Sequence, residues 1–223
     1  MNKLLKTEKL DSGYGGVKII EDINLSLPQN KISVIIGANA CGKSTLLKTM
    51  ARLIKPIDGG VFLDGKEINT INTKLLAQNL GLLPQSGIAP GSIKVSELVA
   101  RGRYPYQNLL QPLQDRDYEI IDESLELMGI KDISNRNIDE LSGGQRQRVW
   151  IAMALAQQTD ILLLDEPTTY LDISHQIDIL DLLSDLNRKR KTTIVMVLHD
   201  INLSARYAEY IFAMKDGKLV AQG

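Results

Sequence analysis

The sequence predicts an α/β fold built on a mainly parallel sheet, and two observations carry this prediction. After residue 142, apolar runs of strand length at 161–164 and 192–198 alternate with helical stretches that end near residues 156 and 187. Earlier, the β-branched run 31–36 leads through a glycine-containing loop into a helical stretch, 43–52. Because strands that alternate with helices form parallel sheets covered on both faces, we expect such a sheet at the centre of the molecule.

The N-terminal third has a different pattern, in which short apolar runs are separated by tight turns. Asp64-Gly65 lies between two such runs, and this dipeptide is a strong signal for a β-hairpin. A second hairpin is expected near the C-terminus, at 210–214 and 218–220 around Asp216-Gly217. We therefore expect an N-terminal antiparallel β subdomain beside the parallel core. Its strands are predicted at 17–20, 23–27, 61–63 and 66–68.

The middle of the chain, from about residue 92 to 129, is predicted to be helical. Apolar residues recur with helical spacing at 95–100 and 115–128, and the segment between them is rich in Tyr, Pro and Gln. We interpret this region as a helical insertion that carries an irregular surface loop. The whole chain, 1–223, is then one domain with an α-helical subdomain, about 88–156, inserted in its core.

Composition and charge limit the classes of function. The 223 residues include 26 Lys and Arg against 27 Asp and Glu, so the formal net charge is −1. Because nucleic-acid binders usually carry clustered basic residues, no nucleic-acid partner is expected. No run approaches the ~18 apolar residues of a membrane-spanning helix, no secretory signal is recognisable, and the single Cys excludes an internal disulfide. We expect a cytoplasmic chain that reaches a membrane only through a partner.

A phosphate-binding motif follows the strand expected at 31–36. The segment GANACGKST satisfies G-x-x-x-x-G-K-[ST] between a strand and a helix, as a P-loop does. Backbone N–H groups of such a loop surround phosphates, Lys43 reaches the β- and γ-phosphates, and the Ser44 hydroxyl ligates Mg²⁺. A glycine turn capped by Ser would explain neither the Lys nor the spacing. The predicted nucleotide-contacting residues are Gly37, Ala38, Asn39, Ala40, Cys41, Gly42, Lys43, Ser44 and Thr45.

Two carboxylates follow the strand expected at 161–164. Asp165 and Glu166 stand at its C-terminal end, where open α/β sheets place their ligands. Asp165 is placed to hold Mg²⁺ through water, and Glu166 to polarise the attacking water as a general base. Alone, two acids after a strand would more often cap a helix or face solvent in a turn. Combined with the P-loop, they predict phosphoryl transfer.

The string LSGGQRQR at 141–148 carries a family resemblance. The sequence resembles the ATP-binding-cassette (ABC) ATPases, whose signature motif is LSGGQ, and the resemblance covers essentially the whole chain. Ser142, Gly143 and Gly144 at a helix start leave N–H groups and a hydroxyl facing an anion. Ser142 and Gln145 also fit a capping box, which does not call for two glycines in the first turn. An anion site is therefore favoured, and Ser142 can serve both purposes.

The resemblance implies a P-loop NTPase core with the ABC nucleotide-binding fold, and ATP and Mg²⁺ as cofactors. In this family the signature of one subunit completes the P-loop site of another, so two ATP molecules are held between two cassettes. Because this chain holds one cassette, a second copy of itself is the implied partner. The implied catalytic residues are Lys43, Glu166 and His199, and the implied Mg²⁺ ligands are Ser44, Gln85 and Asp165.

Four further residues match family positions one by one. Tyr14, 23 residues before Gly37, matches the aromatic that stacks on adenine; otherwise it is a buried tyrosine at a strand end. Gln85, in LLPQ, matches the glutamine that touches Mg²⁺ and relays the nucleotide state to membrane subunits. Asp172 matches the loop that crosses the dimer interface, or it caps the following helix. His199, in VLHD, matches the switch histidine at the γ-phosphate, or it is a plain strand-end cap.

The surroundings of these motifs indicate which kind of cassette this is. The 56 residues from Gln85 to Leu141 hold a compact helical subdomain but no long coiled coil of the DNA-repair type. The chain resembles the peripheral ATPase subunits that dock onto separate permease subunits at the cytoplasmic face, with an extracytoplasmic substrate-binding protein. RGRYPYQ at 101–107 and TTYLDISHQ at 168–176 resemble the iron–siderophore, haem and cobalamin importers, and ferric siderophore is preferred. The alternatives are a haem or cobalamin importer, or a soluble ABC ATPase that acts as a nucleotide-gated switch.

Four local features carry further expectations. Taken alone, Arg101 and Arg103 are exposed charges near a helix end. Ala38 and Ala40 replace the Pro and Gly common in the family's P-loop, and Ala fits if neither position needs a positive φ. Cys41 is either a reactive thiol at a positive helix end or, as we favour, a small residue that fits the loop. Family members usually continue for some tens of residues past the final hairpin, so a C-terminal tail is expected to be absent here.

Overall fold

The computed structural model describes residues 4–85, 87, 89, 91–107, 112–169 and 171–223, and it contains two sheets. The larger sheet has six strands in the order β10-β9-β3-β8-β7-β6. Strands β9, β3, β8, β7 and β6 run parallel to one another, and β10 pairs antiparallel with β9. This arrangement confirms the predicted parallel core. The bounds are β3 Ile32–Gly37, β6 Leu80–Leu83, β7 Ile161–Leu164, β8 Thr193–Val197, β9 Tyr210–Lys215 and β10 Lys218–Gln222.

The smaller sheet is antiparallel, with the order β2-β1-β4-β5, and it confirms the predicted N-terminal β subdomain. Its strands are β1 Leu5–Tyr14, β2 Val17–Ser26, β4 Asp58–Leu63 and β5 Lys66–Glu67. The two strands expected at 17–20 and 23–27 are one strand, β2, in which the polar pair Glu21-Asp22 interrupts the apolar pattern. Strand β1 was not predicted, because register shifts against β2 and the positive φ of Lys9 break its alternation.

Both predicted hairpin turns are present. Asp64-Gly65 has φ values of 51° and 77°, and Asp216-Gly217 has 49° and 78°. Two successive positive φ angles are those of a type I′ turn, whose twist matches that of the flanking strands. The first hairpin is shorter than expected, because Ile68 leaves the strand and starts the 3₁₀ turn η1 (Ile68–Thr70).

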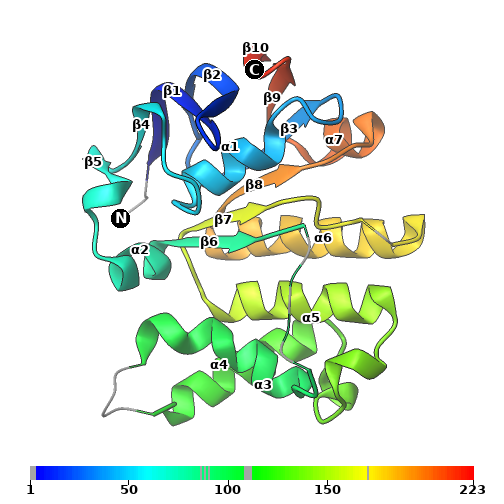
Figure 1. The fold of residues 1–223 in the computed structure, drawn as a ribbon. Helices are drawn as coiled ribbons and strands as arrows, with labels where there is room; N and C mark the ends of the chain where they lie inside the picture. The colour runs from blue at the N-terminus through cyan, green and yellow to red at the C-terminus, as the bar shows by residue number, and fades with distance from the viewer. Residues whose placement is uncertain (1–3, 86, 88, 90, 108–111, 170) are drawn as a thin grey trace.

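Helices cover both faces of the central sheet, as Figure 1 shows. Successive side chains of a strand point to opposite faces, so a central strand packs against other elements on both sides. In β7, Ile161 and Leu163 pack with α1 and the smaller sheet, whereas Leu162 and Leu164 pack with α5 and α6 on the opposite face. Every side chain of β7 is therefore buried. The helices on the core are α1 Lys43–Met50, α2 Thr73–Asn79, α6 Ile173–Arg190 and α7 Ile201–Tyr207.

A second helical layer, formed by α3, α4 and α5, lies below the core in Figure 1. Its bounds are α3 Val95–Ala100, α4 Asp115–Leu127 and α5 Gly143–Ala156, with 3₁₀ turns η2 Arg101–Tyr106, η3 Lys131–Ile133 and η4 Ile138–Glu140. Helices α3 and α4 lie where helical spacing predicted them. Residue 88, the expected start of the subdomain, residues 108–111 of the expected loop and residue 170 of TTYLDISHQ lie outside the described residues.

One expectation about local structure is wrong, and two helices were not predicted. Helices α2 and α7 were not predicted, because they bury one and two apolar side chains, against three in α3, and so show no clear apolar spacing. Arg103 is not an exposed charge, because it is 5% exposed and its Nε donates to Asp117 Oδ1 at 2.8 Å. The pairing partner lies on α4, 14 residues away, which the local sequence does not reveal.

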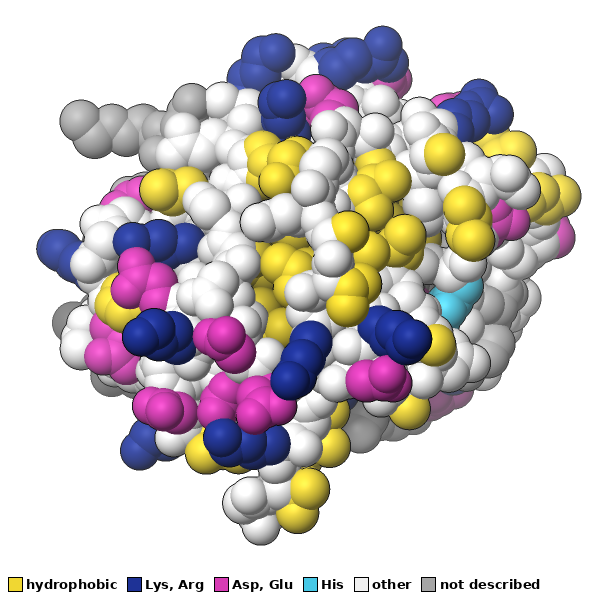
Figure 2. Space-filling model, turned by 90° about the horizontal axis from the view of Figure 1, so that it is seen from above, with side chains coloured by type: hydrophobic (Ala, Val, Ile, Leu, Met, Phe, Trp, Pro, Cys, Tyr) yellow, Lys and Arg dark blue, Asp and Glu magenta, His cyan; other side chains and the backbone are white. Residues whose placement is uncertain are grey.

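One face of the molecule is formed by the first and the last strands of the chain. The N-terminal strands and β10 lie on one side of the molecule, at the top of Figure 1. Seen from that side, apolar side chains lie near the middle of the face and several Lys and Arg side chains near its edges (Figure 2). Exposed apolar residues of these strands include Tyr14, Val17 and Val220. Among the residues the structure describes, no helix has the length and apolar character needed to cross a bilayer.

Candidate nucleotide-binding site

The P-loop joins β3 to α1 and depends on two glycines. A Cβ on Gly37 would stand 2.3 Å from the carbonyl oxygen of Met214 on the neighbouring strand β9. Gly42 has a φ of 100°, and a Cβ there would stand 2.5 Å from the Ile20 side chain. Both positions therefore exclude a side chain, and the loop can turn tightly over the sheet edge.

The two alanines of the P-loop behave differently. Ala40 has a φ of 61°, so the condition under which alanine fits without strain is not met at this position. A left-handed conformation costs an L-residue about 1–2 kcal/mol, and Gly would adopt it without that cost. Ala38 is not among the described residues with positive φ, so alanine is unstrained there. Cys41 is buried at 5% exposure within the apolar cluster below the loop, as its favoured interpretation predicted.

Lys43 lies folded over the loop that precedes it. Its Nζ donates to the carbonyl oxygens of Gly37 at 2.9 Å and Ala38 at 2.8 Å, and the residue is 5% exposed. Carbonyl oxygens satisfy only part of an ammonium charge. The same group can therefore turn to the oxygens of a phosphate bound in the loop.

Ser44 and Asp165 form the candidate metal position. The Ser44 hydroxyl donates to Asp165 Oδ1 at 2.9 Å, and Asp165 is 1% exposed at the end of β7. Its Oδ2 is buried with no hydrogen-bond partner among the described residues, and this burial raises the pKa of Asp165 above its ordinary value. A buried carboxylate oxygen without a donor beside a hydroxyl fits a hard cation such as Mg²⁺, which also takes oxygens from phosphates and water. No described cluster of three His, Cys, Asp or Glu residues offers an alternative metal site.

Glu166 is held by three donors in an uncommon backbone conformation. Its φ is 55°, a strained value for a residue with a side chain. Gln85 Nε2 donates to Oε2 at 2.7 Å, Thr169 Oγ1 donates to Oε2 at 3.0 Å, and His199 Nε2 lies 2.6 Å from Oε1. Partial burial raises the pKa of Glu166, but these hydrogen bonds outweigh it and hold the pKa below its ordinary value. The carboxylate is therefore ionised at neutral pH and can accept a hydrogen bond from water.

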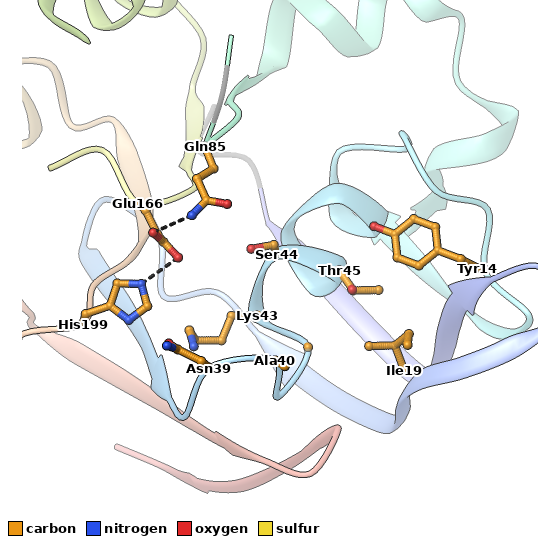
Figure 3. A pocket seen from close by; sticks show the side chains of 11 residues that line it. Tyr14, Ile19, Asn39, Ala40, Lys43, Ser44, Thr45, Gln85, Glu166 and His199 are labelled. Atoms are coloured by element: carbon orange, nitrogen blue, oxygen red, sulfur yellow. Dashed lines mark hydrogen bonds and ion pairs between the residues drawn. The ribbon is translucent and has the colours of Figure 1, made fainter. Parts of the chain in front are cut away.

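One pocket of about 710 Å³ is lined by Lys43, Ser44, Gln85, Glu166 and His199 among others (Figure 3). In Figure 3, Tyr14 and His199 lie at opposite ends, and Ser44 lies between them. Tyr14 is 53% exposed, so the alternative of a buried strand-end tyrosine is wrong. The pocket thus has an aromatic end and a charged end, as a purine nucleoside triphosphate requires. Its lining residues are Tyr14, Ile19, Asn39, Ala40, Gly42, Lys43, Ser44, Thr45, Gln85, Glu166 and His199.

The signature residues and Asp172 do not line this pocket. Ser142 caps α5, with its hydroxyl accepting from Gln145 N at 3.2 Å while Gln145 Oε1 accepts from Ser142 N at 3.2 Å. The capping box is therefore formed in the single chain. Asp172 caps α6, and the backbone N–H of His175, the Ser174 hydroxyl and the His175 ring all bond to it and lower its pKa. The structure confirms the capping alternative for both residues and does not test a second role.

Two residues near the site were not predicted from the sequence. Ile19 lines the pocket from β2, beside the aromatic end. Thr169 bonds to the Glu166 carboxylate at 3.0 Å. An isolated Ile in a strand carries no signal, but Thr169 lies in the quoted string TTYLDISHQ, three residues after Glu166, where a turn could bring it back to the carboxylate.

Comparisons with known proteins agree with this geometry. A family model described as ABC transporter matches residues 20–169. The iron(3+)-hydroxamate import ATP-binding protein FhuC of Bacillus subtilis is 51% identical, over 98% of this chain and 81% of that protein. The petrobactin import ATP-binding protein FpuD of Bacillus anthracis is 50% identical, over 100% and 82%. The ferric enterobactin transport ATP-binding protein FepC of Escherichia coli is 50% identical, over 98% and 81%.

Solved structures agree as well. A bacterial ABC transporter cassette in a dimeric structure superposes with a TM-score of 0.89 at 29% identity, over 98% of this chain and 97% of that one. A dimeric cassette in a post-hydrolysis state bound to ADP and Pi gives a TM-score of 0.88, also at 29% identity, with the same coverage. The likeness extends over almost the entire chain in both cases.

Proposed function

Because this chain belongs to the ABC transporter family, we propose that it hydrolyses ATP to drive the import of ferric siderophores. The observation that carries the ATPase activity is the single pocket in which Lys43, Ser44, Glu166 and His199 converge. The cargo class is supported by the relatives, two of which are named for ferric compounds of different siderophores. These two relatives are 51% and 50% identical to this chain, so their similarity supports ferric siderophores as a class but does not favour one siderophore over the other.

At the charged end of the pocket, the phosphates replace bonds that the loop makes to itself. Lys43 exchanges the carbonyls of Gly37 and Ala38 for phosphate oxygens, and the free N–H groups at the start of α1 face the same anion. Ser44, Gln85 and Asp165 would hold Mg²⁺. When bound, the ion neutralises charge on the phosphates. Asp165, whose Oδ2 lacks a partner among the described residues, would supply the carboxylate of this set.

Glu166 and His199 serve the attacking water. The ionised Glu166 orients the water and accepts its proton, and the hydrogen bonds from Thr169 and Gln85 keep the carboxylate in place. His199 Nε2 lies 2.6 Å from Glu166 Oε1, within reach of the charged end of the pocket, and in this proposal it contacts the γ-phosphate of bound ATP. Tyr14, at the other end of the pocket, is exposed enough to stack on the adenine ring.

A second copy of the chain completes the site in this proposal. Ser142, Gly143, Gly144 and Gln145 lie outside the pocket of their own chain, and in the dimer they meet the nucleotide of the partner, with Asp172 at the interface. The solved relatives include dimers. The dimer docks at the cytoplasmic face of the membrane onto permease subunits, through the helical subdomain of about 88–156, and an extracytoplasmic binding protein delivers the cargo.

The variant Glu166→Gln tests the catalytic assignment. It should bind ATP normally, hydrolyse it at least 100-fold more slowly, on the order of a lost general base, and accumulate as an ATP-bound dimer on gel filtration. Lys43→Ala is the contrasting variant, because it should lose ATP binding and therefore form no such dimer. Undiminished turnover in Glu166→Gln would contradict the role of Glu166.

Uptake by cells that lack this chain tests the cargo. Transport of labelled ferric siderophore should fall to background and return with the wild-type gene but not with Glu166→Gln. Haem and cobalamin uptake should be unaffected. If haem or cobalamin uptake is lost instead, the cargo assignment is wrong although the ATPase assignment stands. If a purely soluble partner co-purifies from detergent-extracted cells, the importer assignment itself is overturned.

A further inference from the structure

A side chain in the signature helix contacts the turn that carries Glu166 of the same chain. Gln147 lies in the second turn of α5, and its Nε2 donates to the carbonyl oxygen of Pro167 at 2.9 Å in a partly buried setting. One helical turn earlier, Gly144 lies so close to Leu171 that an added Cβ would stand 3.2 Å from the Leu171 side chain. The start of α5 therefore contacts both Pro167 and Leu171, which lie near the two ends of the segment between β7 and α6.

This contact falls on the turn in which Glu166 has its uncommon backbone conformation. Glu166 has a φ of 55°, and the turn that follows is closed by Thr169 N, which donates to the Glu166 carbonyl at a long 3.3 Å. The ring of Pro167 fixes its φ, so the orientation of its carbonyl depends on ψ alone. A donor on that carbonyl removes this remaining freedom. Gln147 thus helps to hold the strained turn, and with it the Glu166 carboxylate.

Helix α5 connects the signature residues to this contact. Its first residues are the signature, and Ser142, the N-cap, lies five residues before Gln147. A helix of 14 residues moves as a rigid rod on the scale of one turn, so a displacement at its N-terminus reaches Gln147 almost unchanged. Arg148 next to it anchors the same helix to α6 through Asp178 at 3.3 Å.

We propose that Gln147 is a positioning residue that couples the ATP held at the signature of one chain to Glu166 of that same chain. Each chain's signature faces the nucleotide on the partner's P-loop, so occupancy of one ATP site sets the geometry of the base in the other. This inference rests on the dimer and the Glu166 role proposed above. It adds that the two ATP sites are coupled through a side chain that touches neither nucleotide.

Homodimers provide the first test. Gln147→Met keeps the length of the side chain and removes the donor. It should lower kcat on the order of tenfold and leave the Kd for ATP unchanged, because a displaced base slows chemistry without weakening binding. In a Glu166→Gln background it should still form the ATP-bound dimer. Arg146→Met is the matched control, since Arg146 is exposed and should leave kcat unchanged. An unchanged kcat in Gln147→Met, or an equal loss of ATP-dependent dimerisation, would overturn the proposal.

Mixed dimers separate the coupling from local damage to the signature. In one arrangement Gln147→Met and Glu166→Gln are on the same chain, so the active Glu166 keeps its own Gln147. In the other they are on different chains, so the only active Glu166 lacks it. The second arrangement should turn over on the order of tenfold more slowly than the first. Equal rates, or a slower first arrangement, would overturn the proposal, whereas failure of wild-type dimers to hydrolyse ATP would count against the proposed function itself.

Discussion

Two regions of the molecule bury charged side chains, and they differ in how completely those charges are satisfied. At the nucleotide pocket, Asp165 leaves one carboxylate oxygen without a donor among the described residues, and Lys43 Nζ donates to two carbonyl oxygens of its own loop and, at 4.0 Å, to Cys41 Sγ. At turn η2, Arg103 donates to Asp117 Oδ1 and to the Ala156 carbonyl, each at 2.8 Å, and stacks over a tyrosine ring. The first region is poised for a ligand, and the second needs none.

The satisfied region joins the helical layer to the core. Gln78 of α2 donates to the Pro105 carbonyl at 2.8 Å, and the Tyr106 hydroxyl donates to the Gln157 carbonyl at 2.9 Å. With the Arg103 bonds to α4 and the end of α5, turn η2 meets elements of both layers. The string RGRYPYQ therefore has a structural role in this chain, in addition to the resemblance that it carries.

Breaking the η2 region should have the largest effect on stability. Arg103→Met leaves the carboxylate of Asp117, whose side chain is 14% exposed, without its cation, and it should lower the free energy of unfolding by about 3–5 kcal/mol. Arg101→Met is the matched control, because Arg101 makes no ion pair with a described residue, and its effect should stay within about 0.5 kcal/mol. Urea unfolding of both variants measures the difference. A loss below 1 kcal/mol for Arg103→Met would show that the pair is not structural.

In the pocket, by contrast, the substitution Asp165→Asn should raise the free energy of unfolding. The folded-state pKa of Asp165 is raised above the ordinary 3.8, so its contribution to stability is fully present below that value and is lost as pH rises through the folded pKa. Asp165→Asn removes the ionised state. The nucleotide-free variant should therefore be more stable than the wild type at pH 7, by about 1 kcal/mol, and the gain should shrink toward pH 4. Thermal melts across this range test the prediction, and a gain that is constant with pH would contradict it.

The smallest effect is expected at the P-loop alanines. Ala40→Gly relieves a left-handed φ and should stabilise the protein by about 0.5–1 kcal/mol. Ala38→Gly adds chain freedom where no positive φ is needed, so it should destabilise by about the same amount. Denaturant midpoints of the pair should move in opposite directions. A shift of the same sign in both variants would show that the conformation of Ala40 is not the cause.

The placement of the P-loop and of the two acidic residues at one edge of the sheet was predictable because each motif is local. The P-loop lies between a strand and a helix, and Asp165 and Glu166 end a strand whose four residues are all buried. Since the ends of parallel strands meet at one edge of a sheet, the spacing alone places these groups together. The hairpins around Asp64-Gly65 and Asp216-Gly217 were predictable for the same local reason.

The contacts between distant segments were not predictable. Arg103 reads as an exposed charge because Asp117 and Ala156 lie 14 and 53 residues away. The bond from Gln147 to Pro167 spans 20 residues and links a helix to a turn in different layers. Strand β1 was missed because its side chains follow an irregular register that only its pairing with β2 and β4 imposes.

The amino-acid sequence by itself indicated most strands and helices of the parallel core, the P-loop motif and the two acidic residues after β7, since these depend on periodicity and on residues adjacent in the chain. Only the tertiary structure decided that Tyr14 is exposed at the far end of the pocket from His199, that Ala40 is in a left-handed conformation, and that Asp165 keeps an oxygen without a partner among the described residues. The physical reason is that burial and hydrogen-bond satisfaction are properties of surroundings, and the surroundings of each of these residues come from segments far away in the sequence.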